Sequence, residues 1–184
     1  MCGIVGYVGE KNNASSVLLN GLKKLEYRGY DSCGIATILN KELHIYKTVN
    51  RIDSLVSCIQ NDDAYIGIGH TRWATHGGVS KENAHPHVDN TNKFVVVHNG
   101  IIENYISLKD MLQNKGYKFY SDTDTEVIPN LIRMNFEGNL LEAVKKTTDM
   151  LEGSYALGIV ELDNPDEIIA TKRNSPLIVG LRRK

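Results

Sequence analysis

The chain opens with Met1-Cys2-Gly3-Ile4-Val5-Gly6, and the cysteine at its second position bears on both fold and function. Once an initiator methionine is removed, a cysteine at this position carries a thiol nucleophile and a free α-amine on one residue. The α-amine has a pKa of about 7.7–8.0, so it can accept a proton near neutral pH. Position alone does not establish this role, because a cysteine near a chain start is more often a small buried residue. Residues 3–9, rich in Gly and Val, predict a short buried strand directly behind the thiol.

The composition is that of one ordinary globular domain. The chain has 184 residues, of which 41% are hydrophobic and 23% charged, and its formal net charge is −1. No basic block supports nucleic-acid binding, and no apolar run reaches the roughly 18–20 residues of a membrane span. Cys2, Cys33 and Cys58 form no close-spaced framework and no signal peptide precedes them, which favours reduced thiols in the cytoplasm. We expect Cys58 to be a core residue of a helix.

The periodicity of apolar residues predicts strands accompanied by helices in pairs, without strict alternation of strand and helix. This order favours an α+β or layered sandwich fold over a doubly wound sheet. Asn139 and Glu142 have the spacing of a helix capping box, and 164–166 predicts a turn between two strands. Helical periodicity falls on 14–25, 52–59, 105–116, 125–135 and 139–151, and strand-like runs on 3–9, 35–39, 43–49, 65–69, 94–98, 155–162 and 168–172. The polar segment 74–92 is long enough to predict a functional loop.

A cysteine that attacks an amide needs partners, and several candidates lie at strand ends. Asn99-Gly100 offers a side-chain amide and a glycine N–H as oxyanion donors, although the same dipeptide is typical of a hairpin turn. Arg72 offers a guanidinium fork for the carboxylate of an amino-acid substrate, or else a surface ion pair. Asp122 or Asp124 could bind the substrate ammonium, or else cap the helix that follows.

Five of the six histidines lie between residues 70 and 98, and two interpretations of them are open. His85-Pro86-His87 suggests metal ligands, but no cysteine accompanies it at a recognised ligand spacing, and the only acidic residues that do are Glu82 and Asp89. We therefore predict no metal site. A Cys–His catalytic pair with His70, His76 or His98 as base is the second interpretation. It is unnecessary if Cys2 supplies its own amine.

Six segments of the sequence carry a resemblance to one known family: 2–6 (CGIVG), 27–32 (YRGYDS), 69–77 (GHTRWATHG), 83–87 (NAHPH), 98–104 (HNGIIEN) and 123–126 (TDTE). Together they resemble the glutaminase domain of the glutamine–fructose-6-phosphate aminotransferases. These proteins are class II glutamine amidotransferases and N-terminal-nucleophile hydrolases, and the similarity runs from residue 2 to about residue 181. The resemblance implies an α+β fold, a four-layer α-β-β-α sandwich, over a single domain at 1–184.

The resemblance also implies a role for each candidate residue. Cys2, freed of Met1, attacks the side-chain amide of glutamine and forms a thioester, while Asn99 and the Gly100 N–H form the oxyanion hole. No cofactor and no metal are implied. The residues implied to hold glutamine or order its pocket are Arg72 for the α-carboxylate, Asp124 for the α-ammonium, Trp73, Thr75 and His76 for the pocket lining, and Arg28 for the order of the site.

The sequence departs from the family pattern in ways that bear on function. Cys33 stands where the family commonly has Ala, and a retained Met1 would leave Cys2 without its amine, giving an inactive glutamine-binding fragment. The chain stops soon after Leu181, where the family's domain continues. We therefore expect a domain that is incomplete at its C-terminus. We expect the parent enzyme to be a homodimer, and fructose 6-phosphate to bind only through its isomerase domains, which are absent from this chain. The alternative is another class II amidotransferase with a different acceptor.

Overall fold

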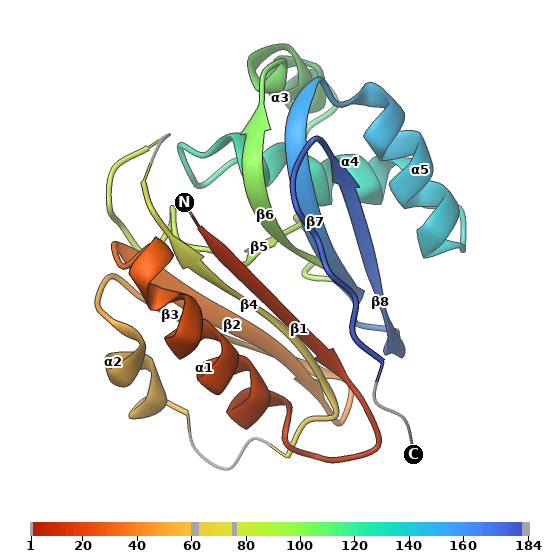
Figure 1. Ribbon diagram of the computed structural model, residues 1–184. Coiled ribbons are helices and arrows are strands. Elements are labelled where there is room, and N and C mark those ends of the chain that lie inside the picture. The colour runs from red at the N-terminus through yellow and green to blue at the C-terminus, as the bar shows by residue number, and fades with distance from the viewer. Residues whose placement is uncertain (1, 60–62, 75–76, 182–184) are drawn as a thin grey trace.

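A computed structural model describes residues 2–59, 63–74 and 77–181 and shows two antiparallel sheets stacked face to face between helices (Figure 1). Sheet A has the strand order β1-β4-β2-β3, and sheet B has the order β5-β6-β7-β8. In chain order the elements are β1 (Gly3–Val8), α1 (Ala14–Leu25), η1 (Glu26–Arg28), β2 (Ser32–Leu39), β3 (Glu42–Thr48), α2 (Ile52–Val56), β4 (Ile66–Arg72), β5 (His87–Val88), β6 (Phe94–Ile102), α3 (Tyr105–Asn114), η2 (Asp124–Glu126), α4 (Val127–Asn135), α5 (Leu140–Met150), β7 (Gly153–Glu161) and β8 (Asn164–Arg173).

The outer face of sheet A is covered by α1 and α2, and glycines in β4 let α1 approach closely. A side chain at Gly67 would lie 2.8 Å from Leu18 Cδ1, and one at Gly69 would lie 2.9 Å from Leu22 Cδ1. Leu18 and Leu22 are fully buried, as is Ile35 of β2 beside them. The alternation of glycine with isoleucine in β4 therefore reserves one face of the strand for the helix and the other for sheet B.

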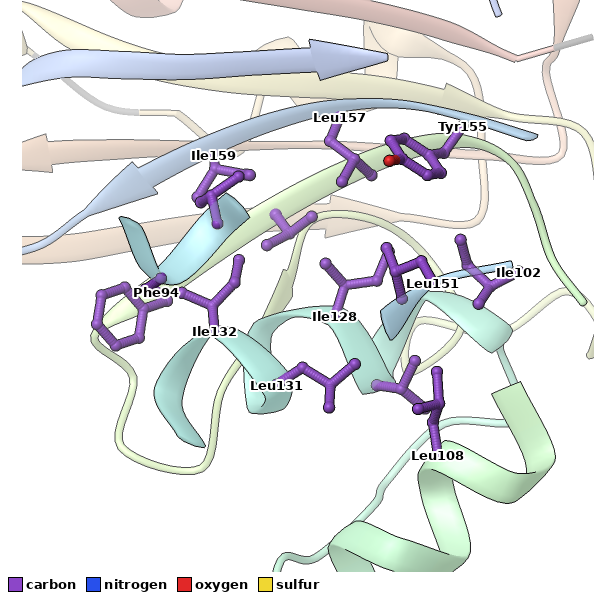
Figure 2. Close-up of a cluster of buried hydrophobic side chains, with 14 of the residues drawn as sticks. Phe94, Ile102, Leu108, Ile128, Leu131, Ile132, Leu151, Tyr155, Leu157 and Ile159 are labelled. Atoms are coloured by element: carbon purple, nitrogen blue, oxygen red, sulfur yellow. The ribbon is translucent and has the colours of Figure 1, made fainter. Parts of the chain in front are cut away.

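The outer face of sheet B is covered by α4 and α5, with α3 packed against α4 (Figures 1 and 2). Figure 2 shows Ile128 and Ile132 of α4 pointing toward the sheet, with Ile132 near Phe94 and Ile159. Leu131 lies on the side of α4 that faces Leu108 of α3. Asn139 opens α5 as its N-cap, and its side chain accepts a hydrogen bond from the Glu142 N–H at 3.0 Å, which confirms the predicted cap.

The inner faces of the two sheets enclose an apolar layer of β-branched and small residues. These are Ala36, Ile38, Ile66, Ile68, Val95, Val97 and Val160. Together with the helices on both outer faces, this layer gives the four-layer α-β-β-α sandwich that the resemblance implies.

Several element boundaries differ from the sequence prediction. β4 and β6 extend beyond their apolar runs, to Arg72 and Ile102, because polar residues continue the hydrogen-bonded ladders. The predicted turn at 164–166 is wrong, since Asn164 already begins β8. Cys58 is exposed, contrary to prediction, because α2 ends at Val56 and leaves it outside the helix. Among the described residues, no helix has the length and apolar character that a membrane crossing requires.

Candidate active site

The Cys2 thiol lies at the end of β4, next to the backbone of Trp73. Gly3 pairs with Thr71, so continuing the antiparallel register by one residue places Cys2 opposite Arg72. The Trp73 N–H donates to Cys2 Sγ at 3.2 Å, and the thiol in turn contacts the Trp73 carbonyl at 3.7 Å. Cys2 is half-buried, and side chains alternate along β1, so it shares the face of Ile4 that points into the space between the sheets.

Asn99 and Gly100 reach the thiol from sheet B as part of a continuous strand. They pair with Ala156 and Tyr155 of β7, so the hairpin-turn alternative for Asn-Gly is excluded. Asn99 Nδ2 donates to the Cys2 carbonyl at 3.2 Å. Gly100 has φ +138, and a side chain there would lie 2.0 Å from the Ser154 carbonyl oxygen, so only glycine fits.

Arg72 and Asp124 line the same pocket as Cys2 and Gly100, and both are at least nine-tenths buried. The Arg72 guanidinium donates to the Gly78 and Gly77 carbonyls at 3.1 and 3.2 Å. Burial lowers the pKa of Arg72, while the nearby Cys2, Asp31 and Asp124 raise it.

The two candidate aspartates differ in their position relative to the pocket. Asp124 Oδ2 accepts from the Ile102 N–H at 2.8 Å, which turns its carboxylate toward β6 rather than over its own helical turn. Asp122 is exposed, and its N–H donates to Asn83 Oδ1 at 2.9 Å. Of the two candidates for the ammonium group, only Asp124 lines the pocket.

The remaining predicted site residues have different places. Trp73 lines the pocket with a side chain that is 45% exposed, and its ring meets Tyr30 edge-on at 5.5 Å. Arg28 ends η1 and is half-buried, but it is not among the described residues that line the pocket. Thr75 and His76 lie outside the described residues.

The structure adds two supporting residues, Gly29 and Asp31, to which sequence reasoning gave no role. A side chain at Gly29 would lie 2.9 Å from the Arg72 carbonyl carbon, and the Asp31 N–H donates to the Arg72 carbonyl oxygen at 3.0 Å. Asp31 Oδ2 accepts from the Ala74 N–H at 2.8 Å. These contacts fix the backbone on both sides of Trp73, whose N–H and carbonyl face the thiol. The only signal in the sequence is the polar run 27–32 itself.

Four buried histidines, His70, His85, His87 and His98, form a cluster at the pocket, and all of them except His87 line it. The His70 and His85 rings stack at 4.0 Å, and His87 meets His85 edge-on at 4.7 Å. Burial lowers the pKa of His70 to about 3 and those of His85 and His87 well below the usual value, so the rings are neutral at pH 7. No group of three or more metal-ligating side chains occurs in the part of the chain that the structure describes.

The same contacts weigh against His70 or His98 as the base of a Cys–His pair. The third candidate, His76, lies outside the described residues. His70 Nε2 contacts the His98 carbonyl and Asn99 Oδ1, both at 2.9 Å, and His98 Nδ1 contacts Thr125 Oγ1 at 2.9 Å. His70 Nε2 and His98 Nδ1 are therefore engaged away from Cys2 Sγ, which hydrogen-bonds with the Trp73 backbone. Their lowered pKa values also make His70 and His98 poor proton acceptors.

Residues 70–183 match the family model described as "Glutamine amidotransferase domain". The chain belongs to this family. The amidotransferase domain is 55% identical over 183 residues to the glutamine–fructose-6-phosphate aminotransferase (isomerizing) of Clostridium acetobutylicum and 52% identical to that of Caldanaerobacter subterraneus. Each match covers 98% of this chain and 30% of the relative, so the chain spans less than a third of the length of these curated relatives.

The solved glutamine phosphoribosylpyrophosphate amidotransferase of B. subtilis has the same fold. It superposes with a TM-score of 0.76 at 28% identity, over 88% of this chain and 35% of the longer one. Family membership and the α-β-β-α architecture predicted from the sequence are thereby confirmed. The roles of individual site residues stay predictions.

Proposed function

We propose that this amidotransferase domain hydrolyses the side-chain amide of glutamine to glutamate and ammonia. The observation that carries the proposal is the pocket itself, in which Cys2 meets Arg72 and Asp124, a cation and an anion, beside the backbone of Gly100. A free amino acid presents a carboxylate and an ammonium at one end. The opposite charges match those two groups, and the thiol is left for the side chain.

The proposed reaction uses Cys2 as nucleophile and, once Met1 is removed, its α-amine as general base. The amine takes the thiol proton, directly or through a water molecule, as sulfur attacks the amide carbon. Asn99 Nδ2 and the Gly100 N–H stabilise the developing oxyanion. The C–N bond then breaks, the proton passes to the leaving nitrogen, and ammonia departs from a thioester. Attack by water on the thioester releases glutamate and restores the thiol.

The wall of the pocket is set before substrate arrives. Both Nη atoms of Arg72 are held by the carbonyls of Gly77 and Gly78, which fixes the plane of the guanidinium fork. Asp124 is held by the Ile102 N–H. Because neither group has to be ordered on binding, a small ligand can be oriented at low entropic cost.

For the fate of the ammonia we propose fructose 6-phosphate as acceptor, bound by a part of a longer parent enzyme. The support is the 55% and 52% identity to aminotransferases whose names state that acceptor. A phosphoribosyl acceptor is the second candidate, favoured by the shared fold with the B. subtilis amidotransferase at 28% identity. The full-length gene product, supplied with glutamine and each acceptor in turn, separates the two. Formation of glucosamine 6-phosphate is expected, and its absence would refute the first acceptor.

Hydrolysis by the domain itself is tested by intact mass and glutamate release on the same preparation. We expect the mass of the chain without Met1, together with glutamate formation from glutamine. Processed chain that releases no glutamate contradicts the proposed hydrolysis. Retained Met1 with no release supports the inert glutamine-binding fragment, and removal of Met1 by an aminopeptidase should then restore turnover.

A further inference from the structure

His70 makes two hydrogen bonds through a single ring nitrogen, and one of them reaches the proposed oxyanion donor. His70 Nε2 lies 2.9 Å from the His98 carbonyl oxygen and 2.9 Å from Asn99 Oδ1. A carbonyl oxygen only accepts hydrogen bonds, so Nε2 must carry the proton. That proton is shared between the two oxygens, and Asn99 Oδ1 is thereby the accepting end of its amide.

The surroundings keep His70 neutral and in place. The side chain is 1% exposed, its ring stacks on His85 at an interplanar angle of 13°, and burial is the largest cause of its low pKa. Its Nδ1 is buried without a hydrogen-bond partner among the described residues, as expected for the bare nitrogen of the Nε2–H tautomer. Protonation there would place a charge inside a cluster of histidines.

Asn99 is consequently fixed at both ends of its amide. Oδ1 accepts from His70, and one hydrogen of Nδ2 donates to the Cys2 carbonyl at 3.2 Å. The second hydrogen on Nδ2 remains to serve an oxyanion formed at the thiol. A flipped amide would set Nδ2–H against the His70 Nε2–H and Oδ1 against the Cys2 carbonyl oxygen, two repulsive contacts.

We infer that His70 is a positioning residue, which holds the Asn99 amide with its N–H groups facing the nucleophile. The inference rests on the proposed function, because it assumes that Asn99 is an oxyanion donor. His70 does not touch the reacting atoms in this account. It selects one of two orientations of the group that does.

Two substitutions of His70 by amide side chains separate hydrogen-bond donation to Asn99 from simple space filling. His70→Gln keeps a donor at about the reach of Nε2, whereas His70→Asn carries its donor only as far as Nδ1. For His70→Asn we expect kcat for glutamate release to fall by about 10- to 100-fold with little change in KM. This loss is smaller than the roughly 10²–10³-fold loss that follows deletion of an oxyanion donor, because Asn99 itself is still present. His70→Gln should retain most of the wild-type kcat. His44→Asn, the same change in β3 outside the pocket, is the matched control.

A double-mutant cycle with Asn99→Ala identifies the residue through which His70 acts. Once Asn99 is absent, His70→Asn should cause no further loss of kcat. If His70→Asn lowers kcat further on the Asn99→Ala background, the inference is overturned. It is also overturned if Asn99→Ala is impaired while His70→Asn keeps the wild-type kcat. If Asn99→Ala itself retains wild-type kcat, the proposed oxyanion hole fails instead.

A measurement on the unaltered protein covers the case in which the variants do not fold. The ¹⁵N ring resonances of His70 should report a neutral imidazole protonated at Nε2 from pH 5 to pH 8. A ring protonated at Nδ1, or a ring that titrates in this range, would overturn the inference.

Discussion

The space between the two sheets has an apolar end and a polar end, and the same strands build both. In β4 the inward-facing residues are Ile66 and Ile68 at one end and His70 and Arg72 at the other. In β6 the inward face carries Val95 and Val97, and the same alternation brings Asn99 beyond them. All of these positions except Asn99 are buried.

The two ends differ in what satisfies the side chains. At the apolar end, burial of hydrocarbon is sufficient. At the polar end, buried charged groups need hydrogen-bond partners. Gly77 and Gly78, which follow β4, supply them for Arg72, and Ile102 at the end of β6 supplies one for Asp124. One sandwich thus provides a stable scaffold at one end and a fixed set of charges and donors at the other.

The largest effect should follow from removing the nucleophile at the polar end. Cys2→Ala should reduce glutamate release by about 10⁴-fold or more, because the thioester can no longer form. Thermal unfolding should be nearly unchanged, since Cys2 is only half-buried. Steady-state kinetics and calorimetry measure the two effects separately. Turnover near the wild-type rate would remove Cys2 from the mechanism.

At the apolar end, truncation of a buried side chain should affect stability alone. Ile68 is fully buried, and Ile68→Ala should lower the free energy of unfolding by about 2–5 kcal/mol. The kcat of the molecules that remain folded should stay near wild type. Val8→Ala, at a position 45% exposed, is the control and should cost far less in urea unfolding. If kcat of folded Ile68→Ala falls steeply, the two ends are not independent.

Arg72→Lys tests the charge at the polar end without removing it. Lysine cannot reproduce the bidentate fork, so we expect KM for glutamine to rise by about 10- to 100-fold. The matched control is Arg51→Lys, at an exposed position at the start of α2, which should leave KM unaltered. Should Arg72→Lys also leave KM unaltered, Arg72 does not bind the substrate carboxylate.

The smallest effect is the loss of folding stability at acidic pH that is caused by His70. The pKa of His70 is about 3 in the folded protein and about 6.5 in an unfolded chain, so below pH 6.5 the unfolded chain binds a proton that the folded protein does not. Stability is therefore present above pH 6.5 and is lost as pH falls toward 3. Between pH 7 and pH 5.5 His70 alone should account for about 1 kcal/mol of this loss. Between pH 7 and pH 5.5 the free energy of unfolding in urea should fall by that much more in wild type than in His70→Gln. An equal fall in the two proteins would contradict the prediction.

Much of the scaffold could be predicted from the sequence because local signals and tertiary packing agree. The period of α1 and the Asn139 cap are examples. Local signals failed where long-range contacts determine the outcome. β4 continues through His70 and Arg72 only because β1 and β2 flank it, and Cys58 is exposed because α2 ends early.

The candidate site shows the same division. The proposed roles of Cys2, Arg72 and Asp124 could be predicted from residue type and motif. Gly29 and Asp31 support the site through backbone contacts with Arg72 and Ala74, and such contacts leave no periodic signal in a single sequence. The choice of Asp124 over Asp122 likewise required knowing which carboxylate lines the pocket.

The central claim, that Cys2 is the nucleophile of a glutamine site, can be tested through the contrast among the three cysteines. Cys33 is buried with its pKa raised to about 12, and Cys58 is exposed but lies after α2, away from the pocket. The chain, freed of Met1, is treated with a glutamine analogue that bears a diazoketone in place of the amide, and its peptides are mapped by mass spectrometry. We predict one adduct, on Cys2, which excess glutamine suppresses. Labelling of Cys58 in preference to Cys2, or labelling of Cys2 that glutamine does not suppress, would contradict the account.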